Sequence, residues 1–186
     1  MDKILKKEEQ AILLLRKLYQ NYGYQPYKMS RFEEYDLYVR NKDFLVSDQV
    51  ITFSDRQGRL LALKPDVTLS IIKNAGKSRD TQRVYYNENV YRVDPQTRAF
   101  REIMQTGLEC IGDLSSADVA EVVLLAAQSL QTLGENFVLD ISHMGIVGGI
   151  LEKSGLSRSG QEKAMQFLHQ KNGHELQKLC AAEGCY

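Results

Sequence analysis

The residues from Phe100 to Ile111 form one long strand candidate, and its polar side chains are the first candidates for chemistry. Side chains alternate between the two faces of a strand, so Gln105, Gly107 and Glu109 are expected on one face. At roughly 3.3 Å per residue, Gln105 and Glu109 stand about 13 Å apart along it. Glu109 could pair with a cation, Gln105 could donate and accept hydrogen bonds, and Gly107 leaves a floor for a small zwitterion. The alternative is an ordinary polar face exposed to solvent.

Three more polar side chains are expected beside this surface. Arg92 ends the preceding strand candidate, and its guanidinium could hold a carboxylate or a phosphate in a bidentate fork. Asp66 and Thr68 open a short helix, where Asp66 could bind an ammonium group and Thr68 offers a hydroxyl. Each charged residue also has a plainer interpretation: Arg92 as a surface residue at a strand end, and Asp66 as the N-cap of its helix.

Helices and strands in a mixed order must position these side chains. Apolar residues at helical spacing predict an amphipathic helix over 3–22, with Asp2 as its N-cap and Gly23 as its stop. A polar turn containing Gly58 separates two apolar runs, which predicts a hairpin. Ser115 and Asp118 form a capping box before another helix. The elements predicted after the first helix are strands over 24–28, 50–53, 60–63, 83–92, 100–111 and 137–141, and helices over 66–75, 117–133, 146–153 and 155–186.

The order of these elements predicts an α+β fold, because helices and antiparallel hairpins mix without regular βαβ alternation. Residues 30–48 show no clear pattern. We expect one main domain over 1–155 and a helical segment over 156–186.

Composition excludes several classes of protein. The chain has 186 residues, of which 43% are hydrophobic, enough for one medium domain with a core. Lys+Arg and Asp+Glu both number 24, so the net charge of zero gives no overall attraction to nucleic acid or acidic membranes. No apolar run approaches the roughly 20 residues of a membrane helix, and the N-terminus does not resemble a signal peptide, so we expect a cytoplasmic protein. Three cysteines (Cys110, Cys180 and Cys185) are too few and too scattered for a disulfide framework.

Three segments, in order, resemble the histidyl-tRNA synthetases of class II. LALKPDVT, at 61–68, is similar to that family's leucine-arginine-proline-acid-x-threonine motif. VYR at 90–92 with REIMQTGLE at 101–109 resembles motif 2 in its histidyl form, and LDISHMG at 139–145 resembles the segment after it. The resemblance covers about residues 5–155 and implies an incomplete class II synthetase-like core, an antiparallel sheet flanked by helices.

The resemblance implies histidine-binding roles for five residues. Asp66 and Thr68 match positions that hold the amino group of the histidine substrate. Gln105 and Glu109 match residues that line the histidine pocket, with Glu109 near the imidazole. Arg92 matches the motif 2 arginine, which contacts the carboxylate and the ATP α-phosphate.

The chain departs from the synthetase pattern where ATP would bind. Asp94 stands where glutamate is expected, and Ala99 stands where the synthetase has an arginine for ATP. The loop between them is one residue shorter, and Ser30 replaces the motif 1 proline. The chain also ends before any glycine-rich motif 3 and before the leucine-aspartate-tyrosine-tyrosine segment. Loss of arginines that bind phosphate removes the electrostatic stabilisation that adenylate formation needs.

Within this family, the combination resembles the regulatory subunits of ATP phosphoribosyltransferase. It implies a protein without catalysis or cofactor, a homodimer within a hetero-oligomer, whose partner is a short catalytic subunit. It also implies feedback control of the first step of histidine biosynthesis, with histidine as the effector. The alternatives are an N-terminal fragment of an active histidyl-tRNA synthetase and a dimerisation scaffold without a ligand.

Two weaker signals are disfavoured. The last twenty residues contain His169, His174, Cys180 and Cys185, but no CxxC or HxxxH pair, so we expect no metal site. A basic rim for RNA could be formed by Arg31, Arg40, Lys64 and Arg98. The zero net charge argues against this rim.

Overall fold

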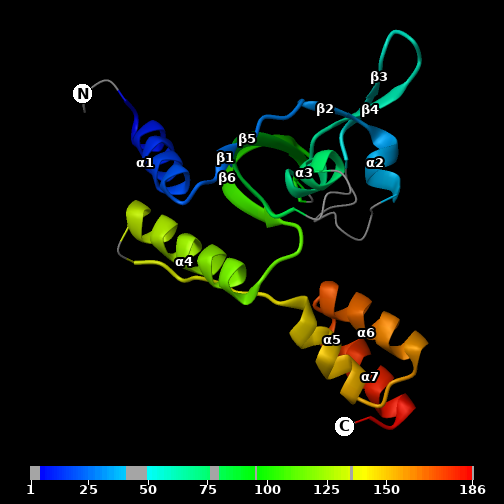
Figure 1. Cartoon of the computed structure of the whole chain (residues 1–186). Coiled ribbons are helices and arrows are strands. Elements are labelled where there is room, and N and C mark those ends of the chain that lie inside the picture. The colour runs from blue at the N-terminus through cyan, green and yellow to red at the C-terminus, as the bar shows by residue number, and fades with distance from the viewer. Residues whose placement is uncertain (1–4, 41–49, 76–79, 95, 135, 186) are drawn as a thin grey trace. The chain divides into compact units, whose positions relative to one another are not determined.

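The alternating residues over 82–111 fold into the long antiparallel pair of strands that the sequence predicts (Figure 1). The two strands are β5 (Gln82–Val93) and β6 (Phe100–Ile111). A two-residue strand, β1 (Gln25–Pro26), pairs in parallel with β5, so the order in this sheet is β1-β5-β6. The structure, a computed structural model, describes residues 5–40, 50–75, 80–94, 96–134 and 136–185.

A second, smaller sheet has the strand order β2-β4-β3. Its strands are β2 (Phe32–Glu34), β3 (Thr52–Ser54) and β4 (Leu60–Leu63), and the short helix α2 (Tyr35–Arg40) follows β2. The β3–β4 hairpin is the predicted one, and its turn places Gly58 at φ +80°, a conformation that favours glycine. After β4, the Lys64 carbonyl accepts the Tyr91 amide at 2.9 Å, and the Lys64 amide donates to the Arg31 carbonyl at 3.1 Å. Residue 64 therefore joins this sheet to β5.

Different helices cover the two faces of the β5–β6 pair. On one face, α1 (Lys7–Asn21) and α4 (Ser116–Leu133) pack on the strands. Their shared core contains Leu15, Tyr19, Tyr24, Tyr85 and Leu125. On the other face, α3 (Thr68–Ala75) is preceded by Val67, which packs with Ile71 and Val90 beside Tyr86 and Ile111. The face predicted for Gln105 and Glu109 is therefore the α3 face, because Ile111 shares their parity along β6.

The ends of α1 show how local signals set a helix. Its first turn is fixed by the Lys6 amide, which donates to Glu9 Oε2 at 2.7 Å. The helix begins at Lys7 with Lys6 as its N-cap, so the predicted start at residue 3 with Asp2 as the N-cap is wrong; Asp2 itself lies outside the described residues. Gly23 follows the last turn at φ +81°, which confirms the predicted stop.

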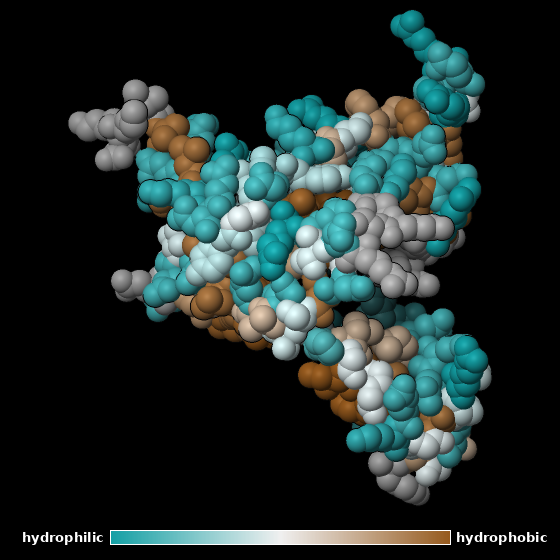
Figure 2. Space-filling model, viewed as in Figure 1, coloured by the Kyte–Doolittle hydropathy of each residue, from teal (hydrophilic) through white to brown (hydrophobic). Residues whose placement is uncertain are grey.

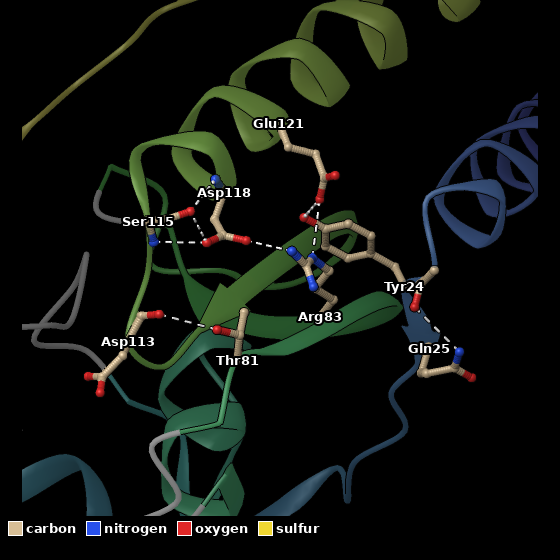
Figure 3. Close-up of polar contacts among 9 residues, drawn as sticks. Tyr24, Gln25, Thr81, Arg83, Asp113, Ser115, Asp118 and Glu121 are labelled. Carbon is tan, nitrogen blue, oxygen red and sulfur yellow. Dashed lines mark hydrogen bonds and ion pairs between the residues drawn. The ribbon is translucent and has the colours of Figure 1, made fainter.

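The start of α4 is tied to β5 by charge (Figure 3). The predicted capping box is confirmed: Ser115 Oγ accepts the Asp118 amide, and Asp118 Oδ2 accepts the Ser115 amide at 2.8 Å. Arg83 of β5 pairs with Asp118, and its Nε lies 3.2 Å from Glu121 Oε1. Hydrogen bonds from Ser115, followed by the charge of Arg83, hold the pKa of Asp118 below its ordinary value.

A C-terminal unit over Asp140–Tyr186 is compact in itself, as is the N-terminal unit over Met1–Leu139. It consists of α5 (Met144–Lys153), α6 (Arg158–His169) and α7 (Gly173–Glu183). Its core contains Leu151, Leu156, Ala164 and Cys185. The units divide before the boundary at 155 expected from the sequence, because α5 packs with the later helices. Of the helices described, none has the length and apolar composition that crossing a bilayer requires.

The strand predicted over 137–141 is wrong. Residues 136–143 form no strand, and the side chains of Val138 and Ile141 are 86% and 67% exposed. A strand needs a neighbour that satisfies its backbone amides and carbonyls. No described strand pairs with this segment, so its apolar composition alone was not sufficient.

Candidate functional site

Two of the predicted ligand-binding residues, Thr68 and Glu109, meet across the α3 face of the sheet. Thr68 Oγ1 donates a hydrogen bond of 2.6 Å to Glu109 Oε1. Asp66 lies in the same group, because its charge acts on Glu109. Asp66 Oδ1 also accepts the Leu69 amide at 3.1 Å, which confirms the plainer interpretation of Asp66 as a cap of α3.

The other two predicted residues, Gln105 and Arg92, lie on this face toward the β5–β6 loop. In the strand register, Gln105 is opposite Glu88 and Arg92 is opposite Arg101. Arg92 Nε donates to the Pro65 carbonyl at 2.9 Å, so one edge of its guanidinium is held beside the start of α3. All five predicted residues are half-buried. The structure thus brings them to one surface, while their roles in binding stay a prediction.

The sequence did not identify Tyr86, whose ring lies against Gly107. These two residues are opposite each other in the register, and a Cβ built on Gly107 would lie 2.6 Å from Tyr86 Oη. The gap beside Gly107 is therefore not the open floor that we expected, because the tyrosine ring fills it. Burial raises the pKa of the Tyr86 phenol, and the charges of Glu109 and Asp66 act in the same direction. Tyr86 thus remains a neutral hydrogen-bonding group in the centre of the site.

Glu109 is the most electrostatically perturbed carboxyl of the site. Burial raises its pKa, the hydrogen bond from Thr68 lowers it, and the nearby Asp66 charge raises it. Two carboxyl groups in a partly desolvated site repel each other, so a cation placed between them would be stabilised. The site can therefore hold a cationic group at this end, with Arg92 available for an anionic group at the other.

A buried ion pair between Lys64 and Glu88 lies next to the predicted ligand-binding surface. Lys64 Nζ lies 2.8 Å from Glu88 Oε2, and the side chains are 0% and 17% exposed. Lys64 therefore cannot belong to the basic rim for RNA considered from the sequence. Arg40 of that rim pairs with Asp36 at 3.5 Å. No signal in the sequence distinguished Lys64 from a surface lysine, except its place at the end of an apolar strand.

The side chain of Asp94, the residue at which the resemblance to the synthetases leads us to expect a glutamate, makes its contacts within and beside its own loop. Its Oδ1 accepts the amides of Gln96 and Thr97 at 3.0 and 2.9 Å, and its Oδ2 pairs with Arg101 at 2.8 Å. The Thr97 amide is the main cause that holds the pKa of Asp94 below its ordinary value. Both carboxylate oxygens thus stabilise the turn, and Ala99 has no side-chain donor to offer a phosphate.

Comparison with known proteins identifies the family. The sequence matches the histidyl-tRNA synthetase family over residues 3–185. It is 31% identical over 172 residues to the histidine–tRNA ligase of Archaeoglobus fulgidus, covering 90% of this chain and 42% of that protein. It is 33% identical over 180 residues to the ATP phosphoribosyltransferase regulatory subunit of Clostridium kluyveri, covering 94% of this chain and 46% of that protein. The chain spans less than half the length of these two relatives.

The fold agrees with this match. The whole chain superposes on 63% of a chain in the ATP phosphoribosyl transferase (HisG:HisZ) complex from Thermotoga maritima, with a TM-score of 0.68 and 21% identity. At that identity the likeness establishes the fold, which confirms the expected α+β core of the class II synthetase type. The family match and the shared fold both extend over nearly the entire chain, and the chain therefore belongs to the histidyl-tRNA synthetase family.

Proposed function

We propose that this chain belongs to a cytoplasmic regulatory subunit of ATP phosphoribosyltransferase. In this proposal it has no catalytic activity, it binds a short catalytic subunit, and histidine bound at the α3 face regulates the first step of histidine biosynthesis. The observation that carries the proposal is a contrast within one surface. Its amino-acid-binding end keeps the Thr68–Glu109 contact, whereas its loop end uses Asp94 for the loop itself.

The retained end has the groups that a zwitterionic amino acid requires. Asp66 and Glu109 supply negative charge for the ammonium and imidazole groups, and Arg92 can face the carboxylate. Thr68 already donates to Glu109, so a ligand that binds there must replace or share this hydrogen bond. Ligand binding thus changes the contact between α3 and β6, and an effector acts only by favouring one such arrangement over another.

The loop end is less suited to a nucleotide. A triphosphate is normally met by several cationic groups, which stabilise the charge that develops during transfer. Here Arg101 is paired with Asp94, and position 99 carries an alanine, which has no cationic group to offer. This arrangement supports histidine binding without adenylation.

An apolar surface supports association between copies. Figure 2 shows apolar side chains gathered over α4 and the segment that follows it. On α4, Val119, Leu124 and Leu133 are about half exposed, at 46%, 49% and 54%. On α1, Leu13 and Leu14 are 48% and 52% exposed. The apolar patch over α4 is of the kind found at protein interfaces, which agrees with the proposed homodimer.

The proposal is tested by titrating histidine into the chain by calorimetry. Removing the charge of Glu109, by Glu109→Gln, should weaken binding about tenfold or more, because a hydrogen bond to a charged group is lost. Glu102→Gln is the matched control: Glu102 lies on the same strand but on the opposite face, where it accepts from Asn89 and Tyr91. No heat at millimolar histidine, or equal loss in both variants, would contradict histidine binding at this site.

An active histidyl-tRNA synthetase remains the second candidate. It is favoured by the retained motif 2 arginine, Arg92, and by the 31% identity to a histidine–tRNA ligase. Pyrophosphate exchange that depends on histidine would support this candidate and exclude the regulatory one. The regulatory function instead predicts that addition of the chain stimulates a short catalytic subunit, with no exchange.

A further inference from the structure

Two cysteines meet at the C-terminal end of α7. Gly184 adopts φ +71°, and beyond it the Cys185 amide donates to the Cys180 carbonyl at 2.9 Å. This is the outer hydrogen bond of a Schellman cap, in which the side chains of the two bonded residues commonly touch. Cys180 packs against the cluster that contains Cys185, and its side chain is the main cause that raises the pKa of the Cys185 thiol. The cap therefore places the two sulfur atoms together, although they are separated by four residues in the sequence.

The surroundings hold this pair in place from both sides. The Cys185 side chain is 9% exposed and packs in the core of the C-terminal unit with Leu156 and Ala164. The Glu183 carboxylate accepts the amide of Ser157 at 2.8 Å and its hydroxyl at 3.1 Å, so the last turn of α7 is fixed to the start of α6. Cys180 is half-buried and remains within reach of a small molecule in solution.

The chemistry of the pair favours a disulfide over a metal site. A structural zinc ion needs four ligands, and thiolates usually supply them with histidine. Within the described ranges, no three His, Cys, Asp or Glu side chains gather closely enough to hold a metal ion. A pair of adjacent thiols without further ligands is suited to oxidation, since a disulfide needs only two cysteines whose Cα atoms lie about 4.4–6.8 Å apart and whose side chains face each other.

We propose that Cys180 and Cys185 are a reversible dithiol–disulfide site that reacts with small-molecule disulfides of the glutathione type. The Cys180 thiolate attacks one sulfur of the oxidant, forms a mixed disulfide and releases one thiolate. The Cys185 thiolate then attacks the Cys180 sulfur, closes the protein disulfide and releases the second thiolate. The two protons from the cysteines end on the two released thiols, so one disulfide is reduced while one is formed. The product closes a covalent loop across the C-terminal end of α7, from Cys180 to Cys185, whose side chain packs in the core of this unit.

The experiment equilibrates the chain with mixtures of reduced and oxidised glutathione, followed by acid quench, alkylation and tryptic digestion. Cleavage after Lys178 leaves both cysteines in the peptide 179–186, so one mass spectrum distinguishes the dithiol, the mixed disulfide and the internal disulfide. We expect the internal disulfide to be the product. Because the cap holds the sulfur atoms together, the effective concentration of the two thiols should be at least about tenfold higher in the folded chain than in urea.

Variants separate this effect from ordinary cysteine reactivity. Cys185→Ser should stop at the mixed disulfide on Cys180, because the resolving thiol is absent. Gly184→Ala should lower the effective concentration about tenfold, since a side chain in the left-handed conformation opposes the cap. The proposal is overturned if the native chain accumulates only the mixed disulfide, or if folding leaves the effective concentration equal to that in urea.

Discussion

Replacing Gly107 by alanine tests whether the Tyr86 ring fills the centre of the site. The new Cβ would lie 2.6 Å from Tyr86 Oη and 2.8 Å from Cζ, and the ring is packed against Ile71 and Val90. Overpacking of this kind costs about 1–3 kcal/mol. Glycine-to-alanine changes otherwise stabilise by about 0.4–1 kcal/mol, because the unfolded chain loses freedom. We therefore expect a net loss of about 1–2 kcal/mol in the free energy of unfolding.

Urea unfolding followed by tyrosine fluorescence measures this loss in the N-terminal unit, which contains Gly107. The chain has ten tyrosines and no tryptophan, and only Tyr186 lies outside the N-terminal unit. With a denaturant slope of about 2 kcal/mol per molar urea, in the middle of the usual range, the midpoint should fall by about 0.5–1 M. The same variant should weaken histidine binding, because Tyr86 must move within the site.

Gly134→Ala is the matched control for the unfolded-state effect. Gly134 belongs to the same unit, has φ 177°, and has nothing within 4 Å of an added Cβ. This control should be stabilised by about 0.4–1 kcal/mol. If Gly107→Ala is as stable as Gly134→Ala, the ring does not occupy the position described, and the reasoning about the centre of the site is refuted.

Two further predictions concern charges. Lys64→Met should destabilise the chain by about 2–3 kcal/mol and Glu88→Leu by about 3–5 kcal/mol, because each variant leaves a buried partner unpaired. The double variant should recover most of this loss, since neither charge is then buried alone. Additive losses in urea unfolding would show that the two side chains do not interact. For Glu109, the folded pKa lies above the ordinary value of 4.5, so its contribution to stability falls as pH rises from that value to the folded pKa. The Glu109→Gln variant lacks this pH-dependent loss, so its free energy of unfolding relative to that of the native chain should increase over the same pH interval. A difference in the free energy of unfolding that does not depend on pH would contradict the burial of Glu109.

Most of the local structure was predictable from the sequence. The ends of α1 and α4 depend on Gly23, Ser115 and Asp118, which act on backbone groups within four residues of themselves. The period of two along β6 was sufficient to place Gln105 and Glu109 on one face, since alternation follows from strand geometry alone. The expectation that Asp66 caps a helix was correct for the same local reason.

The contacts of the site required the tertiary structure. Tyr86 meets Gly107 and Glu88 meets Lys64 because of the β5–β6 register and the path of the chain after β4, and neither is encoded in a short stretch of residues. The segment 137–141 has the composition of a strand but forms none, because a strand depends on a neighbour supplied from elsewhere.

The sequence by itself therefore determined which residues share a face, where α1 ends and where α4 begins, because periodicity and capping act over a few residues. Only the tertiary structure decided what each polar side chain contacts. Glu109 accepts from Thr68, 41 residues away, and Asp94 turns its oxygens to its own loop instead of to a ligand. The physical reason is that a carboxylate has several potential donors in any sequence, and the packing of α3 on the sheet selects which of them it meets.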